Sequence, residues 1–314
     1  MKLLDFFKHY PDESSCKLAF KDYRERSGVI CKKCGGDSHW WLTSKEQYEC
    51  KKCHFRMSLK SGTVMENSKL PFQYWFVAMH LMSSTKKSLS ALELQRQIGH
   101  KYYEPIWAMM HKIRRVMSQR DELYQLKNQV ELDEGFYSIG FTLETDEFTG
   151  KKEELKRGKG SQKKAKVLVM ASFDKVAPKD FNPKKYKTAS RLKYIKMKVI
   201  DDLEAETINQ QTVKNIDLQA RVYTDGYKSF NKLPLIIKQH CKYNMSFDKA
   251  DKVLPWVHKA ITNSKNLLKA IHHCVWHEYL QNYLDEFCYK HNRRYFGTNV
   301  FERVLIAAVT FTWF

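Results

Sequence analysis

The spacing of apolar residues divides the chain into a helical part and a part that mixes helices with strands. Between residues 68 and 120, apolar side chains recur at three- and four-residue steps, the spacing of one helix face. From about residue 128 short apolar runs replace this pattern and predict strands. The predicted strands cover residues 130–140, 166–173, 191–200, 221–224 and 234–238. Helices are predicted at residues 204–217, 226–232 and 277–291 and from Asn299.

The order of these elements predicts an α/β (α+β) fold. Three strands follow one another directly and strand–helix–strand units come next, which favours a mixed sheet with helices packed on it. The apolar C-terminal stretch VFERVLIAAVTFTWF contains Glu302 and Arg303, and we interpret it as a helix of the core. The charged segment between residues 145 and 166 is interpreted as a hairpin or loop. Its cations either face DNA or are simply solvated.

Residues 68–120 contain the pattern of a helix-turn-helix. Ser90 followed by Glu93 fits a capping box, and Gly99 is a suitable C-terminal stop. A further helix runs from about Pro105 to Gln119 and bears a basic face. A short helix, a turn with glycine and a basic helix are typical of DNA-binding domains, although a plain helical bundle with a solvated basic face has the same pattern. The candidate DNA contacts are Lys112, Arg114 and Arg115.

Four of the eight cysteines predict a structural zinc site. Cys31 and Cys34 form one C-x-x-C pair, and Cys50 and Cys53 form a second pair after 15 intervening residues. Four thiolates at this spacing can surround Zn²⁺ as a tetrahedron, and a small ribbon needs such a metal to fold. The alternative is a coincidental set of buried cysteines. The remaining cysteines are interpreted as small buried residues: Cys16, Cys241, Cys274 and Cys288.

The charge balance points to a polyanionic partner. The 314-residue chain has a formal net charge of +20 and a pI near 9.5, and lysines and arginines neutralise phosphates. A basic protein that binds nucleic acid nonspecifically would share this composition. The sequence predicts no signal peptide and no membrane span, and therefore no membrane partner. We expect a cytoplasmic, nucleoid-associated protein with reduced or metal-bound cysteines.

Two aspartates are the candidate catalytic acids. Asp133 lies in the strand-like run VELDEGFYSIG, and Asp225 lies at the end of a second strand in ARVYTDGYKSF. Carboxylates brought from separate strands to one point suit a divalent cation that catalyses phosphoryl transfer. Taken singly, each aspartate is more often a turn or cap residue, and Asp-Gly is a common turn. Asn263 and Lys265 follow as a third polar pair.

Four segments resemble the transposases of bacterial insertion sequences that have an N-terminal zinc ribbon. They are ELDEGF, YTDGYKSF, the VH-x-x-x-x-N-x-K segment and YLDEFCYKHNRR, and they occur in the family's order. The resemblance implies three domains: a zinc ribbon with an N-terminal helix (1–66), a helix-turn-helix domain (67–125) and an RNase H-like catalytic domain (126–314). It also implies Mg²⁺-dependent strand cleavage and strand transfer, with Mn²⁺ as a substitute for Mg²⁺. The implied partners are the terminal inverted repeats, target DNA and further copies of the chain on the DNA ends.

The resemblance assigns roles to individual residues. Asp133 matches the first catalytic acid and Asp225 the second. The third position, usually glutamate, is Asn263, whose amide oxygen binds a cation without adding negative charge. Glu286 is the fallback acid, or else an ordinary acid paired with Lys290.

Four further polar residues have two interpretations each. Lys265 touches a phosphate near the scissile bond or is a solvated cation. His258 orients substrate or water, or is a structural hydrogen-bond partner. Arg293 and Arg294 bind the DNA backbone or pair with acids of the core. Two other functions compete with transposition: a DNA-binding regulator without catalysis, and a metal-dependent nuclease that cuts without joining.

Overall fold

The computed structural model describes residues 1–142, 158, 161–175, 190–243 and 253–312. The chain forms two compact units. The first unit combines Met1–Asp121 with Arg293–Phe314, and the central unit is Glu122–Asn292. The predicted catalytic domain extended to residue 314, whereas the last 22 residues of the chain belong to the first unit. As functional domains, the three predicted segments stay predictions.

The first unit contains a small sheet and six helices, by the described residues. Its sheet has the order β1-β2-β3 with both pairings antiparallel. Its elements are α1 (Leu3–His9), α2 (Glu13–Ser27), β1 (His39–Leu42), β2 (Gln47–Cys50), β3 (Arg56–Ser58), α3 (Phe72–Ser84), α4 (Ala91–Ile98), α5 (Tyr103–Glu122) and α10 (Val300–Thr310). Short 3₁₀ turns lie at η1 (Thr43–Lys45) and η7 (Arg294–Asn299).

The capping and stop signals predicted from the sequence are found at the two ends of α4. The Ser90 hydroxyl accepts the Glu93 amide at 3.1 Å, and Gly99 ends the helix with φ +67°. This left-handed conformation suits glycine because it has no Cβ. The predicted C-terminal core helix is α10, with most of its apolar side chains buried.

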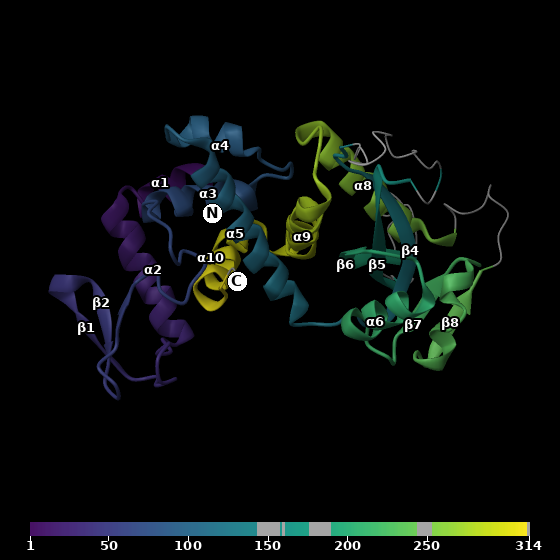
Figure 1. The fold of residues 1–314 in the computed structure, drawn as a ribbon, viewed down its shortest axis with the longest axis horizontal. Coiled ribbons are helices and arrows are strands. Elements are labelled where there is room, and N and C mark those ends of the chain that lie inside the picture. Colours follow the sequence, from purple (N-terminus) through teal and green to yellow (C-terminus); the bar gives the residue numbers. More distant parts are fainter. Residues whose placement is uncertain (143–157, 159–160, 176–189, 244–252, 313–314) are drawn as a thin grey trace, which may run out of the picture. The chain divides into compact units, whose positions relative to one another are not determined.

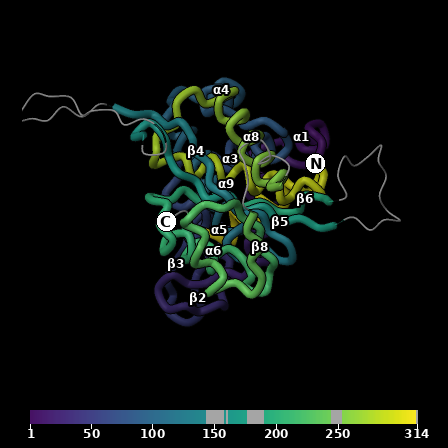
Figure 2. Tube along the Cα trace, turned by 90° about the vertical axis from the view of Figure 1, so that its right-hand side faces the viewer, coloured from purple at the N-terminus to yellow at the C-terminus, as the bar shows by residue number. Residues whose placement is uncertain are grey.

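The central unit is built on a mixed five-stranded sheet of order β6-β5-β4-β7-β8 (Figure 1). β4, β5 and β6 pair antiparallel, whereas β7 pairs parallel to both β4 and β8. Figure 2 shows β5 and β6 side by side along the Cα trace. This sheet confirms the predicted mixed α/β, RNase H-like fold class. The elements are β4 (Gln129–Ser138), β5 (Lys164–Lys175), β6 (Ser190–Ile200), α6 (Ala205–Asn215), β7 (Arg221–Thr224), η4 (Lys228–Phe230), η5 (Leu233–Leu235), β8 (Gln239–Lys242), α8 (Pro255–Ile271) and α9 (His277–Asn292).

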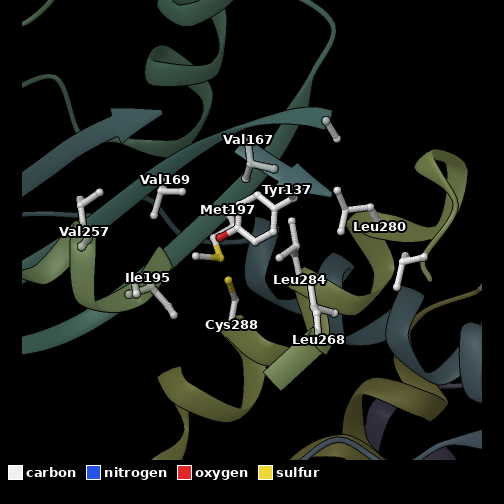
Figure 3. Close-up of a cluster of buried hydrophobic side chains, with 14 of the residues drawn as sticks. Tyr137, Val167, Val169, Ile195, Met197, Val257, Leu268, Leu280, Leu284 and Cys288 are labelled. Atoms are coloured by element: carbon white, nitrogen blue, oxygen red, sulfur yellow. The ribbon is translucent and has the colours of Figure 1, made fainter. Parts of the chain in front are cut away.

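Alternating side chains give this sheet a core on each face. On β5, Val167 and Val169 face one core while Leu168 and Met170 face the other. The first core takes side chains from α8 and α9, among them Val257 and Leu284 (Figure 3). The second core takes side chains from α6 and from the turns after β7. Because both faces are covered, β5 reads in the sequence as a continuous apolar run.

Two predicted elements of the central unit are wrong. The predicted strand 234–238 is instead the 3₁₀ turn η5 followed by irregular chain, and the strand begins only at Gln239. Pro234 supplies no amide hydrogen to a ladder, which explains the displacement. The predicted helix 226–232 is only the three-residue turn η4. Most of the charged segment 145–166 lies outside the described residues.

Two other predictions concern the remaining cysteines and the absence of membrane spans. Cys16 and Cys288 are buried as predicted, but Cys241 is only half-buried and Cys274 is exposed, so the reading of these two as buried is wrong. Within the described residues, no helix combines the length and the apolarity that a membrane span requires.

Candidate active site

The pairing of β4 with β7 positions Asp133 and Asp225. The two strands run parallel, and the last pair in register joins Glu131 to Tyr223. Each aspartate lies two residues beyond that pair on its own strand, and β7 has just ended at Thr224. Asp225 therefore leaves the sheet beside the part of β4 that bears Asp133, at the carboxyl end of a parallel strand, where α/β folds form their sites.

Three carboxylates meet at this point. Asp133, Glu134 and Asp225 each offer an oxygen within 4.8 Å of the other two. We call these three residues the acidic cluster. Glu134 was missed in the sequence, because strict strand alternation sends it to the face opposite Asp133. Its adjacency to Asp133 was the available signal in the sequence.

Backbone amides fix one oxygen of each aspartate. The Glu134 amide donates to Asp133 Oδ1 at 2.8 Å, and the Tyr227 amide donates to Asp225 Oδ1 at 2.9 Å. The second bond closes a turn of the Asx type, so Asp225 also has the turn role that Asp-Gly suggests.

The acidic cluster is electrostatically unfavourable without a cation. Burial raises the pKa of Asp133 well above its usual range, and the nearby carboxylates of Glu134 and Asp225 raise it further. A divalent cation would relieve this repulsion, and Mg²⁺ and Mn²⁺ prefer such hard oxygen ligands. The donor set therefore fits the metal that the resemblance implies.

Helix α8 borders the cluster through His258. Its Nε2 lies 3.8 Å from Asp133 Oδ2. Lys265 lies two turns further along, with Nζ 5.3 Å from the centre of the Tyr137 ring. Burial lowers the pKa of Lys265, and the charge of Lys164 lowers it further. His258 is thus placed at the cluster by geometry, while the role of Lys265 stays a prediction.

The other two candidates for a third metal ligand are not in the acidic cluster. Asn263 is exposed on α8, and at about 100° per residue it lies about 140° around the helix from His258. Glu286 is buried on α9, which packs on β6, two strands from β4. Its carboxylate lies 3.4 Å from Lys290 Nζ, the pairing considered as the alternative. Their catalytic roles stay predictions.

The candidate DNA contacts differ in exposure. Arg115 is exposed on α5, whereas Arg114 is 1% exposed and Lys112 donates to the Glu66 carbonyl at 3.0 Å. DNA contact by these three residues stays a prediction.

The two arginines after α9 are placed differently from each other. Arg293 is buried and paired with Asp121, which is the core-pairing interpretation of this residue. Arg294 is half-buried, with its guanidinium 4.1 Å from the centre of the Tyr295 ring. DNA binding by either residue stays a prediction.

The four cysteines of the ribbon form a second cluster. All four sulfurs lie within 4.8 Å of one another, with Cys31 and Cys53 3.6 Å apart and Cys34 and Cys50 3.5 Å apart. Zn–S bonds of about 2.3 Å in a tetrahedron place sulfurs about 3.8 Å apart, so the group fits Zn²⁺ closely.

The two C-x-x-C turns share one backbone geometry. The Gly35 amide bonds the Cys31 carbonyl at 2.9 Å, and the His54 amide bonds the Cys50 carbonyl at 2.9 Å. Gly35 and His54, each directly after the second cysteine of its pair, both have positive φ. Burial opposes ionisation of the Cys31 thiol, but hydrogen bonds from the Cys34 and Lys33 amides and from the thiols of Cys53 and Cys34 together lower its pKa to about 7. A thiolate of this kind is the form that binds zinc.

Residues 125–292, more than half of the chain, match the model of the ISXO2-like transposase domain, and the chain belongs to this family. The protein is therefore a transposase by family, which confirms the resemblance read from the sequence.

Solved structures are only distantly similar to this chain, and no curated protein matches it. The structure of the Mos1 mariner paired end complex with Mn aligns at a TM-score of 0.31 and 11% identity, over 69% of this chain and 74% of that chain. A pre-cleavage Mos1 transpososome aligns at a TM-score of 0.29 and 9% identity, over the same shares. At these TM-scores the likeness carries no argument.

Proposed function

We propose that this transposase cuts the ends of its element and joins them to target DNA, using divalent cations held at the acidic cluster. The observation that carries the proposal is the meeting of Asp133 and Asp225 from two parallel strands. The net charge of +20 supports a DNA substrate, since cations attract the phosphate backbone. Mg²⁺ or Mn²⁺ supplies the activation of the attacking oxygen and the stabilisation of the leaving oxygen.

Each residue of the proposed site would have its own role in the reaction. Asp133 and Asp225 would hold the cation through their carboxylates. His258, at 3.8 Å from Asp133, orients the water or hydroxyl that attacks the phosphodiester. Lys265 steadies a phosphate beside the scissile bond.

The third oxygen ligand has two candidates of different origin. Asn263 is assigned by the resemblance, whereas Glu134 is supported by its place in the cluster. Glu134 brings a negative charge and Asn263 does not, so the two assignments predict different losses of cation affinity on substitution. Glu286 stays the fallback acid.

The ribbon and the helical segment would recognise the terminal repeats. Cys31, Cys34, Cys50 and Cys53 would hold a structural Zn²⁺ that fixes β1 and β2. The exposed Arg115 of α5 contributes a phosphate contact. We further propose that the protein acts as a homo-oligomer on paired DNA ends in the cytoplasm, at the nucleoid.

The test is a cleavage and joining assay with the DNA that flanks the gene. Wild type and Asp225→Ala are compared with Mg²⁺ and with Mn²⁺ on end-labelled duplexes, together with DNA-binding measurements. We expect metal-dependent cutting and joining by wild type, and loss of both by the variant with end binding retained. Cutting without joining would identify a nuclease, and binding without cutting would identify a regulator. Full cleavage by Asp225→Ala would refute the proposed site.

A further inference from the structure

Glu131 is a buried acid of β4 to which the proposed chemistry assigns no role. It lies two residues before Asp133, on the same face of the strand, and is 3% exposed. It is not part of the acidic cluster found among the described residues. A buried carboxylate is costly unless it is hydrogen-bonded, so its partners show what it does.

Both partners are backbone amides at the start of α8. Glu131 Oε2 accepts the Trp256 amide at 2.7 Å and the Val257 amide at 2.9 Å. The first amides of a helix have no partner within the helix, and Leu254, the capping residue of α8, provides no side-chain bond. Glu131 therefore acts as a capping side chain for α8, although it lies far from this helix in the sequence. Its negative charge suits the helix N-terminus.

The first turn of α8, which Glu131 binds, is followed directly by a residue that lies at the acidic cluster. The Val257 side chain packs into the core between sheet and helices (Figure 3), and the next residue, His258, lies 3.8 Å from Asp133 Oδ2. One turn further, a Cβ added to Gly135 would lie 3.4 Å from the Ile261 side chain. Alternate residues of β4 thus bind the start of α8, bear the candidate acid Asp133 and lie against the next turn of the helix.

We infer that Glu131 is a positioning residue, whose carboxylate fixes the first turn of α8 on β4 and thereby sets His258 against Asp133. The anchoring contact stands on geometry alone. Its consequence for strand cleavage rests on the proposed function.

The order of two conservative variants distinguishes anchoring from other roles. Glu131→Gln keeps the length of the side chain and an acceptor oxygen for both amides, but loses the charge. Glu131→Asp keeps the charge but is one methylene too short to reach them. Anchoring predicts that Gln replaces Glu better than Asp does. A metal ligand or a purely electrostatic role predicts the reverse order.

The first readout is amide exchange in α8, measured by mass spectrometry on the full zinc-loaded chain. In Glu131→Asp we expect exchange of the first turn of α8 to rise about five- to tenfold, the effect of losing helix-capping bonds, with Glu131→Gln close to wild type. The matched control is Glu13→Asp. Glu13 accepts the first amides of α3, from Phe72 at 3.0 Å and Gln73 at 2.8 Å. This control should loosen α3 and leave α8 unchanged.

The second readout is single-turnover strand cleavage at saturating DNA and Mn²⁺. Glu131→Asp should cut about tenfold to a hundredfold more slowly, because small misplacements of reacting groups are costly, while DNA affinity stays constant. Glu131→Gln should restore most of the rate.

Each outcome decides one claim. Unchanged α8 exchange in Glu131→Asp, or an Asp variant that outperforms Gln, would overturn the anchoring role. Loosened α8 with an unchanged cleavage rate would overturn its importance for the reaction. If wild type cuts no DNA while exchange follows the predicted order, the proposed function fails and the anchoring contact stands.

Discussion

Replacing Asp133 by asparagine should stabilise the metal-free protein while it removes cation binding. Asparagine keeps the oxygen that accepts the Glu134 amide at 2.8 Å and removes one charge from the acidic cluster. Two unit charges 4.8 Å apart repel by about 3 kcal/mol at an effective dielectric constant of about 20. Asp133 faces two such charges, Glu134 and Asp225, and protonation relieves part of the repulsion in wild type, so we expect a gain of about 2–4 kcal/mol in the free energy of unfolding at pH 8.

The pH dependence follows from the raised pKa of Asp133. A carboxyl whose pKa is higher in the folded state contributes stability below its unfolded pKa, and loses it as pH rises through the folded pKa. Wild type should therefore weaken between about pH 4 and pH 8. The advantage of Asp133→Asn should shrink as pH falls toward 4, where the wild-type carboxyl is protonated.

The assay is denaturant-dependent amide exchange of the β4 peptide, residues 129–138, in buffer free of divalent cations but with zinc retained in the ribbon. The matched control, Asp121→Asn, has the opposite sign: it leaves the buried Arg293 without its acid and should cost about 3 kcal/mol in the first unit. If Asp133→Asn were destabilising at pH 8, the three carboxylates would not be assembled as described and the reasoning would be refuted.

Three further predictions concern other parts of the chain. Cys31→Ser should lose zinc and weaken binding to the terminal repeats, whereas the exposed Cys274→Ser should keep zinc by metal analysis; retained zinc in Cys31→Ser would refute the four-thiolate site. If Glu134 is the third ligand, Glu134→Gln should lower Mn²⁺ affinity by calorimetry at least about tenfold and Asn263→Ala should not, and the opposite order would assign Asn263. Gly135→Ala should cost about 1–3 kcal/mol by overpacking, because the added Cβ would lie 3.1 Å from the Tyr137 ring, and an unchanged unfolding midpoint would contradict that contact.

The sequence predicted the sheet and drew attention to the two aspartates because both are local signals, while the catalytic role of these aspartates stays a prediction. Apolar runs mark β4 to β7, and an acid at the end of a parallel strand falls where ligand sites form. The register that joins Asp133 to Asp225 could not be read locally. It depends on pairing between strands about 90 residues apart in the sequence, and the free energy of that pairing depends on the whole fold.

Contacts that cross the fold explain the other differences. Glu131 binds amides 125 and 126 residues away, so no spacing in the sequence indicates its role. Glu134 was not predicted because strict alternation places it on the face opposite Asp133, and the end of β7 beside this part of β4 is not visible in the sequence. The prediction of a strand at 234–238 was wrong for a local reason that is visible in the sequence, namely Pro234 within the apolar run.

The measurement that tests the central claim most directly is Mn²⁺ binding to the full zinc-loaded chain, followed by electron paramagnetic resonance. Wild type is compared with Asp225→Asn, which keeps the acceptor for the Tyr227 amide and removes one charge from the cluster. We predict that wild type binds Mn²⁺ with release of protons and that the variant binds at least about tenfold more weakly. Equal binding by the two proteins would contradict a metal site at the acidic cluster.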